Sequence, residues 1–121
     1  MESGLNDLSG KLAVICDNDE VLFAYGEGKR DFMGHKLSDE IEKILRERKS
    51  YVASIADSER VVPVVYPAVE GVTAQAIVPI VSNGDCLGAV ILLSKTEGEK
   101  IDPAAVNLTK LTADILANQF E

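Results

Sequence analysis

Two apolar runs in the second half of the chain predict a β-hairpin. Residues 77–81 and 87–93 are almost entirely apolar, and Asn83-Gly84 lies between them. Asn-Gly is the strongest short hairpin signal, because the favoured type I′ turn needs positive φ at both central residues. The second run is apolar at consecutive positions, which indicates a strand covered on both faces at the centre of a sheet. We expect Leu87, Ala89, Ile91 and Leu93 on one face of this strand, and Gly88, Val90 and Leu92 on the other.

A second hairpin is predicted near the start of the chain. Residues 11–17 and 20–25 are mostly apolar strands, and Asn18-Asp19 supplies the turn between them. Residues 26–36 are interrupted by three glycines, which predicts a loop with a single turn near residues 29–32.

Prolines limit how the remaining predicted strands can pair in a sheet. Residues 51–55 predict a short strand and residues 72–81 a long one. Pro79 in the long strand cannot donate a ladder hydrogen bond, so it implies a bulge or a neighbour on one side only. Residues 61–65 are β-branched, but Pro63 and the proline at 67 confine them to an edge or an irregular path.

Capping residues mark two helices. Ser38 caps a predicted helix over residues 38–48, which has one narrow apolar stripe. Asp102 and Pro103 begin a longer helix over residues 102–120. Its two apolar stripes exceed what one sheet face needs, so we expect one of them to meet another helix or a second subunit. The stripes are Ala104, Leu108, Leu111 and Ile115, and Val106, Ala113, Leu116, Ala117 and Phe120.

The order of these elements predicts one α+β domain over residues 1–121. Strands follow one another and the helices are segregated, which is typical of an antiparallel sheet with helices packed on its faces. Leu5 and Leu8 predict a further short helix ended by Gly10, which looks like the tail of a longer, truncated helix.

Charge and composition exclude several functional classes. The formal net charge is −8 and aromatic residues make up 5% of the chain, so we expect no direct binding to nucleic acid. No apolar run approaches the 18 or so residues that cross a membrane, and the first residues do not form a signal peptide. We therefore expect a cytoplasmic protein with no membrane partner.

The sequence contains no catalytic or metal-binding constellation. Cys16 and Cys86 lie in or beside apolar strands, where reduced, buried thiols are commoner than a redox pair. One histidine and two distant cysteines lack any zinc spacing. We expect no metal and no cofactor.

Several short motifs lie along the chain. They are Pro79-Ile80-Val81, Asn83-Gly84-Asp85, Gly88-Ala89-Val90 and Ser94-Lys95, with Ile15-Cys16-Asp17, Lys29-Arg30-Asp31-Phe32 and Lys36-Leu37-Ser38 as weaker ones. Together they resemble GAF domains, most closely the C-terminal regulatory domains of the stage V sporulation protein T family. The resemblance covers residues from about 12 to 121.

The resemblance implies a GAF-like antiparallel sheet of five or six strands. The terminal helices would lie on one face, and the central helix and loops would cover a pocket on the other. It also implies a regulatory domain of a sporulation-type transcription regulator, which senses a small molecule and forms homo-oligomers through its terminal helices. The basic DNA-binding segment that precedes the domain in that family is absent here, so DNA contact is expected only through a missing N-terminal domain.

Two alternatives remain open at this stage. The same fold can act as an oligomerisation module with no ligand, or, less plausibly with two cysteines, as a cysteine-based redox enzyme. For the sensing hypothesis, we predict a cavity on the sheet face opposite the terminal helices, bounded by residues 26–36, the central helix and residues 57–71. The candidate ligand-binding residues are polar or aromatic groups in apolar strands or covering loops: Tyr25, His35, Ser54, Arg60, Tyr66 and Gln75.

Overall fold

The computed structural model of this chain describes residues 11–26 and 28–119. The predicted helix at residues 5–8 lies outside these residues. The elements begin with strands β1 (Lys11–Cys16) and β2 (Val21–Tyr25), the 3₁₀ turn η1 (Lys29–Asp31), strand β3 (Lys36–Leu37) and helix α2 (Asp39–Glu47). They continue with β4 (Tyr51–Ser54), the 3₁₀ turn η2 (Ile55–Asp57), β5 (Val65–Tyr66), β6 (Ala74–Ser82), β7 (Asp85–Ser94) and helix α3 (Pro103–Asn118).

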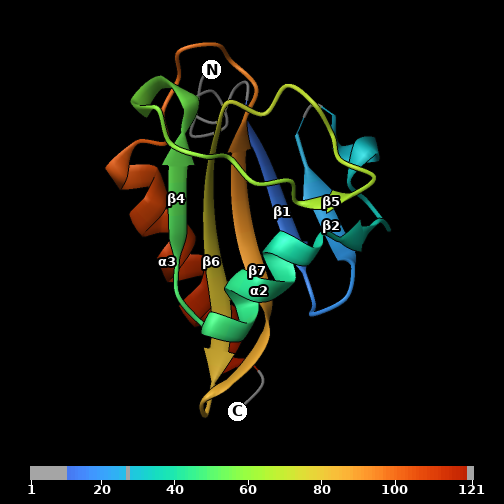
Figure 1. Cartoon of the computed structure of the whole chain (residues 1–121). Helices are drawn as coiled ribbons and strands as arrows, with labels where there is room; N and C mark the ends of the chain where they lie inside the picture. Colours follow the sequence, from blue (N-terminus) through green and yellow to red (C-terminus); the bar gives the residue numbers. More distant parts are fainter. Residues whose placement is uncertain (1–10, 27, 120–121) are drawn as a thin grey trace.

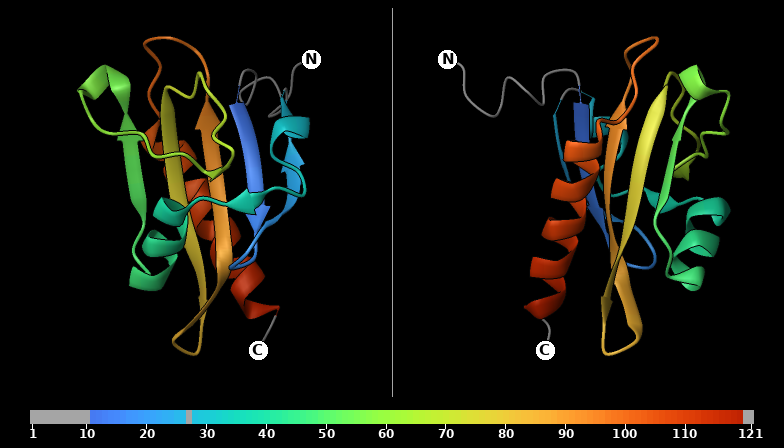
Figure 2. Two further views of the ribbon diagram at one scale, coloured as in Figure 1. Left: turned by 45° about the vertical axis from the view of Figure 1, so that its right-hand side comes forward. Right: turned by 90° about the vertical axis from the view of Figure 1, so that its left-hand side faces the viewer.

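The main sheet is antiparallel and has five strands in the order β2-β1-β7-β6-β4. Strand β7 is central, as its two apolar faces predict. Helix α3 lies on one face of the sheet, and α2 with the segment between β4 and β6 lies on the other (Figures 1 and 2). The result is a three-layer α+β fold, which confirms the predicted fold class.

The two sheet faces carry separate cores. On the α2 face, a large cluster contains Val14, Phe32, Ile41, Ile77 and Ile91 among other buried side chains. On the α3 face, two smaller clusters join alternate residues of β6 and β7 to the helix. Because each strand residue alternates between faces, both cores are built from the same consecutive apolar runs.

One side of β7 differs from the prediction. Leu87 packs with Val90 on the α3 face, whereas Cys86 packs on the α2 face with Ala89. The register between β6 and β7 shifts near Gly88, so a bulge inserts one residue and reverses the alternation before it. The predicted position of Leu87 beside Ala89 is therefore wrong.

Proline positions explain the other strand outcomes. Strand β4 pairs with β6 only as far as Ile77, so Pro79 has β7 as its one neighbouring strand, and the bulge follows directly. This confirms the prediction for Pro79. The prediction that residues 61–65 follow an edge or an irregular path is confirmed, because residues 61–64 form no strand, and Val65 and Tyr66 form only the short β5, which pairs with β3 outside the main sheet.

None of the helices within the described ranges is long and apolar enough to cross a membrane.

Candidate functional site

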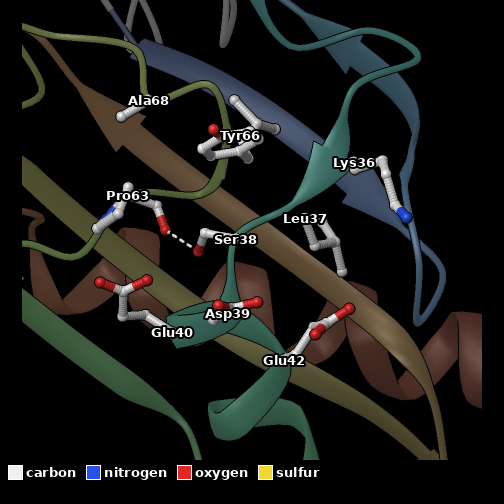
Figure 3. A pocket seen from close by; sticks show the side chains of 10 residues that line it. Lys36, Leu37, Ser38, Asp39, Glu40, Glu42, Pro63, Tyr66 and Ala68 are labelled. Carbon is white, nitrogen blue, oxygen red and sulfur yellow. Dashed lines mark hydrogen bonds between the residues drawn. The ribbon is translucent and has the colours of Figure 1, made fainter.

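An open groove lies between the first turn of α2, strand β3 and the segment that contains β5 (Figure 3). Its volume is about 610 Å³, which exceeds the roughly 300 Å³ that a small ligand needs. The lining residues are Lys36, Leu37, Ser38, Asp39, Glu40, Glu42, Pro63, Val65, Tyr66 and Ala68. These residues come from all three segments that were predicted to bound a ligand cavity.

Ser38 holds the two walls of the groove together. Its hydroxyl oxygen accepts a hydrogen bond from the backbone nitrogen of Ile41 at 3.2 Å and so caps α2. The same hydroxyl donates to the carbonyl oxygen of Pro63, and the Ser38 backbone nitrogen donates to the Val64 oxygen at 2.9 Å. The short β3–β5 ladder continues this connection by pairing Lys36 with Tyr66.

The groove is acidic on one side and aromatic on the other. In Figure 3, the carboxylates of Asp39, Glu40 and Glu42 lie on the α2 side, and the ring of Tyr66 faces them from β5. Tyr66 is 75% exposed. The lining also contains the cationic side chain of Lys36, and Glu40 is paired with Arg60 at 3.4 Å. The three carboxylates still outnumber Lys36, and carboxylates and an aromatic face both attract positive charge.

A second, smaller pocket adjoins the groove. Its volume is about 280 Å³, and it shares Pro63 and Ala68 with the groove. The other lining residues are Phe32, Ile55, Val61, Val62, Val64, Val69, Gly71 and Val72, none of which is charged.

The space directly over the sheet is filled. Val62 and Val64 point into the core of the α2 face and pack with Ile77 and Ile91. Gln75 is 0% exposed, its Oε1 accepts from the Val62 nitrogen at 2.8 Å, and its Nε2 donates to the Val62 oxygen at 3.0 Å. Hydrophobic core therefore fills the space where the cavity against the sheet was predicted. The reason is that Gln75 holds residues 58–73, the covering segment, against the sheet through its two hydrogen bonds to Val62.

The six predicted site residues are dispersed. Tyr66 lines the groove, and Arg60 reaches its rim by pairing with Glu40 at 3.4 Å. His35 lies next to the groove residue Lys36, and its backbone bonds with Val21 and Phe32.

The other three candidates lie elsewhere. Gln75 is the buried tie to Val62 described above. Ser54 is buried at the end of β4 and donates to Asp57 at 3.1 Å. Tyr25 is exposed on the edge strand β2, where it pairs with Ala13.

Sequence reasoning missed the acidic lining residues. Asp39, Glu40 and Glu42 occupy the first turn of α2, where carboxylates also favour the positive end of the helix dipole. Acidic residues in the first turn of a helix are expected for this reason alone. The sequence around them therefore gives no sign of a groove, which forms only because β5 lies beside this turn in the folded chain.

A second surface stands out on α3. Leu108, Leu111 and Ile115 are 54%, 55% and 52% exposed, on the side of the helix opposite its buried residues. They belong to the predicted first stripe, whereas Val106, Ala113, Leu116 and Ala117 of the second stripe pack on the sheet. The structure thus confirms both stripes over residues 103–118 and decides which one faces the sheet; Phe120 of the second stripe lies outside the described residues.

The cysteines offer little nucleophilic chemistry. Burial raises the pKa of the Cys16 thiol to about 12, and Cys86 is half-buried with its Sγ 3.3 Å from the Gly88 oxygen. Within residues 11–26 and 28–119, no cluster of three or more His, Cys, Asp or Glu side chains could hold a metal ion.

Almost the whole sequence matches a known family. Residues 2–121 match the family described as "Stage V sporulation protein T C-terminal, transcription factor". Over 119 residues, the chain is 34% identical to stage V sporulation protein T of Bacillus subtilis (strain 168). This match covers 97% of the chain but 63% of that relative, so the chain spans less than two thirds of the relative's length.

Known structures share the fold. The GAF domain region of a putative membrane protein from Geobacter sulfurreducens PCA has a TM-score of 0.70 at 21% identity, covering 96% of this chain and 84% of that one. The GAF domain of a two-component sensor histidine kinase from Bacillus halodurans has a TM-score of 0.63 at 14% identity, covering 94% and 86%. A type II free methionine-R-sulfoxide reductase from Thermoplasma acidophilum has a TM-score of 0.65 at 11% identity, covering 95% and 83%. At these identities, the likeness concerns the fold alone.

Proposed function

Because this chain belongs to the family of stage V sporulation protein T C-terminal domains, we propose that it is the regulatory GAF domain of a sporulation-type transcription regulator and acts through self-association of α3. The domain would control how a DNA-binding part of the same regulator is assembled. Its own net charge of −8 disfavours direct contact with DNA, so contact with DNA would belong to another part of the regulator. A bacterial transcription regulator acts on DNA in the cytoplasm, so the proposed role implies a cytoplasmic location.

The observation that carries this proposal is the exposed stripe of Leu108, Leu111 and Ile115. Three large aliphatic side chains, each about half exposed at helical spacing, form an apolar face that water covers poorly. The stripe itself contains no charged residue. Of the two charged residues on α3, Asp114 borders the stripe, three residues after Leu111, and Lys110 lies farther around the helix. Such a face is depleted of charge, as the centre of a protein interface is.

Sedimentation velocity tests the proposal. We expect the wild-type chain to sediment above its monomer mass of 13.0 kDa at high concentration. Leu111→Glu places a charge at the centre of the stripe, so this variant should sediment as a monomer with an unchanged circular dichroism spectrum. The matched control is Lys110→Glu, which adds negative charge to the same helix outside the stripe and should leave the mass as in wild type. A wild-type chain that stays at 13.0 kDa would contradict self-association.

A second candidate function is small-molecule sensing, favoured by the groove of about 610 Å³. The residues that would contact a ligand are Tyr66 and the carboxylates of Asp39 and Glu42, and the expected ligand carries a cationic group. A thermal-shift screen of amines, amino acids and nucleosides tests this idea. At a hundredfold excess over Kd, a ligand stabilises the fold by about 2.7 kcal/mol, which is readily detected.

The variant that tests the contact is Asp39→Asn. It keeps the size of the side chain but removes one of the three carboxylates of the first turn of α2, so it should weaken any cationic hit. A screen in which no compound shifts the transition would favour the oligomerisation module without a ligand.

The same proposal assigns no catalytic role to the chain. A buried Cys16 thiol with a pKa near 12 is a poor nucleophile at neutral pH, which disfavours the cysteine-based redox alternative. Incubation with free methionine sulfoxide and dithiothreitol should yield no methionine above the rate without protein.

A further inference from the structure

Two segments from opposite faces of the sheet meet at one end of the molecule. The turn η2 follows β4 and leads into residues 58–73, which cover the α2 face. Residues 95–102 lead from β7 into α3 on the other face (Figure 2). The sheet separates the layer on its α2 face from the layer on its α3 face. Contacts between the two segments therefore connect these layers around the end of the sheet.

An ion pair joins the segments directly. The Lys100 Nζ donates to the Asp57 Oδ1 at 2.6 Å, and the Asp57 Oδ2 accepts from the hydroxyl of Ser54 at 3.1 Å. Ser54 is buried, so one end of the pair is anchored to β4. The pair lowers the pKa of Asp57 and raises that of Lys100.

Thr73 provides a second connection at the same place. Its carbonyl oxygen accepts from the Ile55 nitrogen at 2.8 Å, and its nitrogen donates to the Ser94 oxygen at 2.8 Å. Its hydroxyl donates to the Thr96 oxygen at 2.8 Å. Thr73 therefore holds both the start of η2 and the start of residues 95–102, which lead into α3.

Lys100 lies two residues before the cap of α3. Asp102 caps the helix by accepting from the Ala104 nitrogen at 2.9 Å. Ile101, between them, is buried against Ala74 and Leu92. A displacement of Lys100 is thus transmitted over a short, packed stretch to the first turn of the helix.

We propose that the Asp57–Lys100 pair is a strap that couples the segment covering the groove to α3. Movement of residues 58–73 would displace residues 95–102, which lead into α3. This displacement would change how well the first turn of α3 is ordered, and thereby the surface that self-associates. This regulatory device rests on the proposed self-association through α3. Both side chains are about half exposed, at 44% for Asp57 and 59% for Lys100, so the effect of breaking the strap should be about two- to fivefold rather than all-or-none.

Hydrogen exchange and sedimentation of four variants test the strap. The variants are Asp57→Asn, Lys100→Gln, the double variant, and Arg60→Gln. The last is the matched control, because it breaks another exposed ion pair of the covering segment, with Glu40, that does not reach α3. The amide of Val106 donates to the Asp102 oxygen at 3.0 Å and so reports on the first turn of α3. We expect the strap variants to exchange this amide about two- to fivefold faster than wild type, and to shift the Kd of self-association by a similar factor. The double variant should match the single ones, because both remove the same interaction.

Two outcomes would overturn the strap. One is an unchanged exchange rate at Val106 in Asp57→Asn and Lys100→Gln, and the other is an equal change in Arg60→Gln. A wild-type chain that remains monomeric would instead contradict the proposed self-association, and the exchange rate at Val106 would still decide whether the strap exists.

Discussion

The buried amide of Gln75 should be the main fastening of the covering segment to the sheet. Replacing it by leucine keeps an apolar side chain of similar length but removes both hydrogen bonds to Val62. Val62 is 6% exposed, so its backbone N–H and C=O would lose their partners without gaining water.

The expected cost follows from these two orphaned groups. Each unsatisfied buried polar group costs about 1–3 kcal/mol, which gives about 2–6 kcal/mol for the pair. Burial of the leucine side chain returns about 2 kcal/mol. The difference is about 0–4 kcal/mol. We therefore expect Gln75→Leu to lower the free energy of unfolding by about 2 kcal/mol, the middle of this range and a large part of the 5–15 kcal/mol typical of a domain.

Urea unfolding followed by circular dichroism measures this change. The matched control is Gln119→Leu, because Gln119 is exposed at the end of α3 and its replacement should change stability by less than about 0.5 kcal/mol. A Gln75→Leu variant that is more stable than wild type would refute the reasoning.

A glutamate at the same position gives an independent check through pH. In Gln75→Glu, a protonated carboxyl can accept from the Val62 nitrogen and donate to the Val62 oxygen, whereas the buried carboxylate cannot donate. Folding should therefore raise the pKa of this carboxyl. Its contribution would be present below the unfolded pKa of about 4.3 and lost as pH rises through the folded pKa. Relative to wild type, the variant should be more stable at pH 4 than at pH 7.

Three further predictions concern packing, capping and thiol chemistry. Gly88→Ala would place a Cβ 2.0 Å from the Cys16 oxygen and should cost about 3 kcal/mol or more, whereas Gly71→Ala, with φ +92° and open space, should cost about 1 kcal/mol by thermal unfolding. Ser38→Ala should cost about 1–2 kcal/mol in the same assay, because the capping acceptor and the donor to Pro63 are both lost. Ser38→Asp should cost more, because it keeps the capping acceptor but places a buried carboxylate against the Pro63 carbonyl oxygen. Iodoacetamide at pH 8.5 should label Cys86 in the native protein and Cys16 only after unfolding; equal rates would contradict the raised Cys16 pKa. Because folding favours the neutral Cys16 thiol, its contribution to stability should be present below pH 9 and lost as pH rises toward 12.

Much of the fold is encoded by local patterns. The apolar run of β7 predicts a central strand, Ser38 and Asp102 predict the starts of α2 and α3, and the positions of both helical stripes follow from a period of 3.6 residues. These features depend on neighbours within a few residues, so the sequence displays them directly.

The candidate site depends on contacts between distant segments. Nothing near Gln75 in the sequence indicates that its amide binds Val62, and nothing near Asp39 indicates that Tyr66 will face it across a groove. The Gln75–Val62 contact and the groove between Asp39 and Tyr66 both form when residues 58–73 fold back over the sheet. The local sequence pattern of residues 58–73 is compatible with many different paths of this segment.

Two choices illustrate what only tertiary structure decided. The bulge beside Gly88 moved Leu87 to the α3 face, because a single inserted residue reverses the alternation of a strand. Packing of α3 on β6 and β7 selected the stripe with the small residues Ala113 and Ala117, which allow the helix to approach the sheet closely. The larger side chains of Leu108, Leu111 and Ile115 were left on the surface, where a second copy of the chain could cover them. The sequence by itself therefore determined that α3 has two apolar faces, and the close packing of the sheet decided which of them remains exposed.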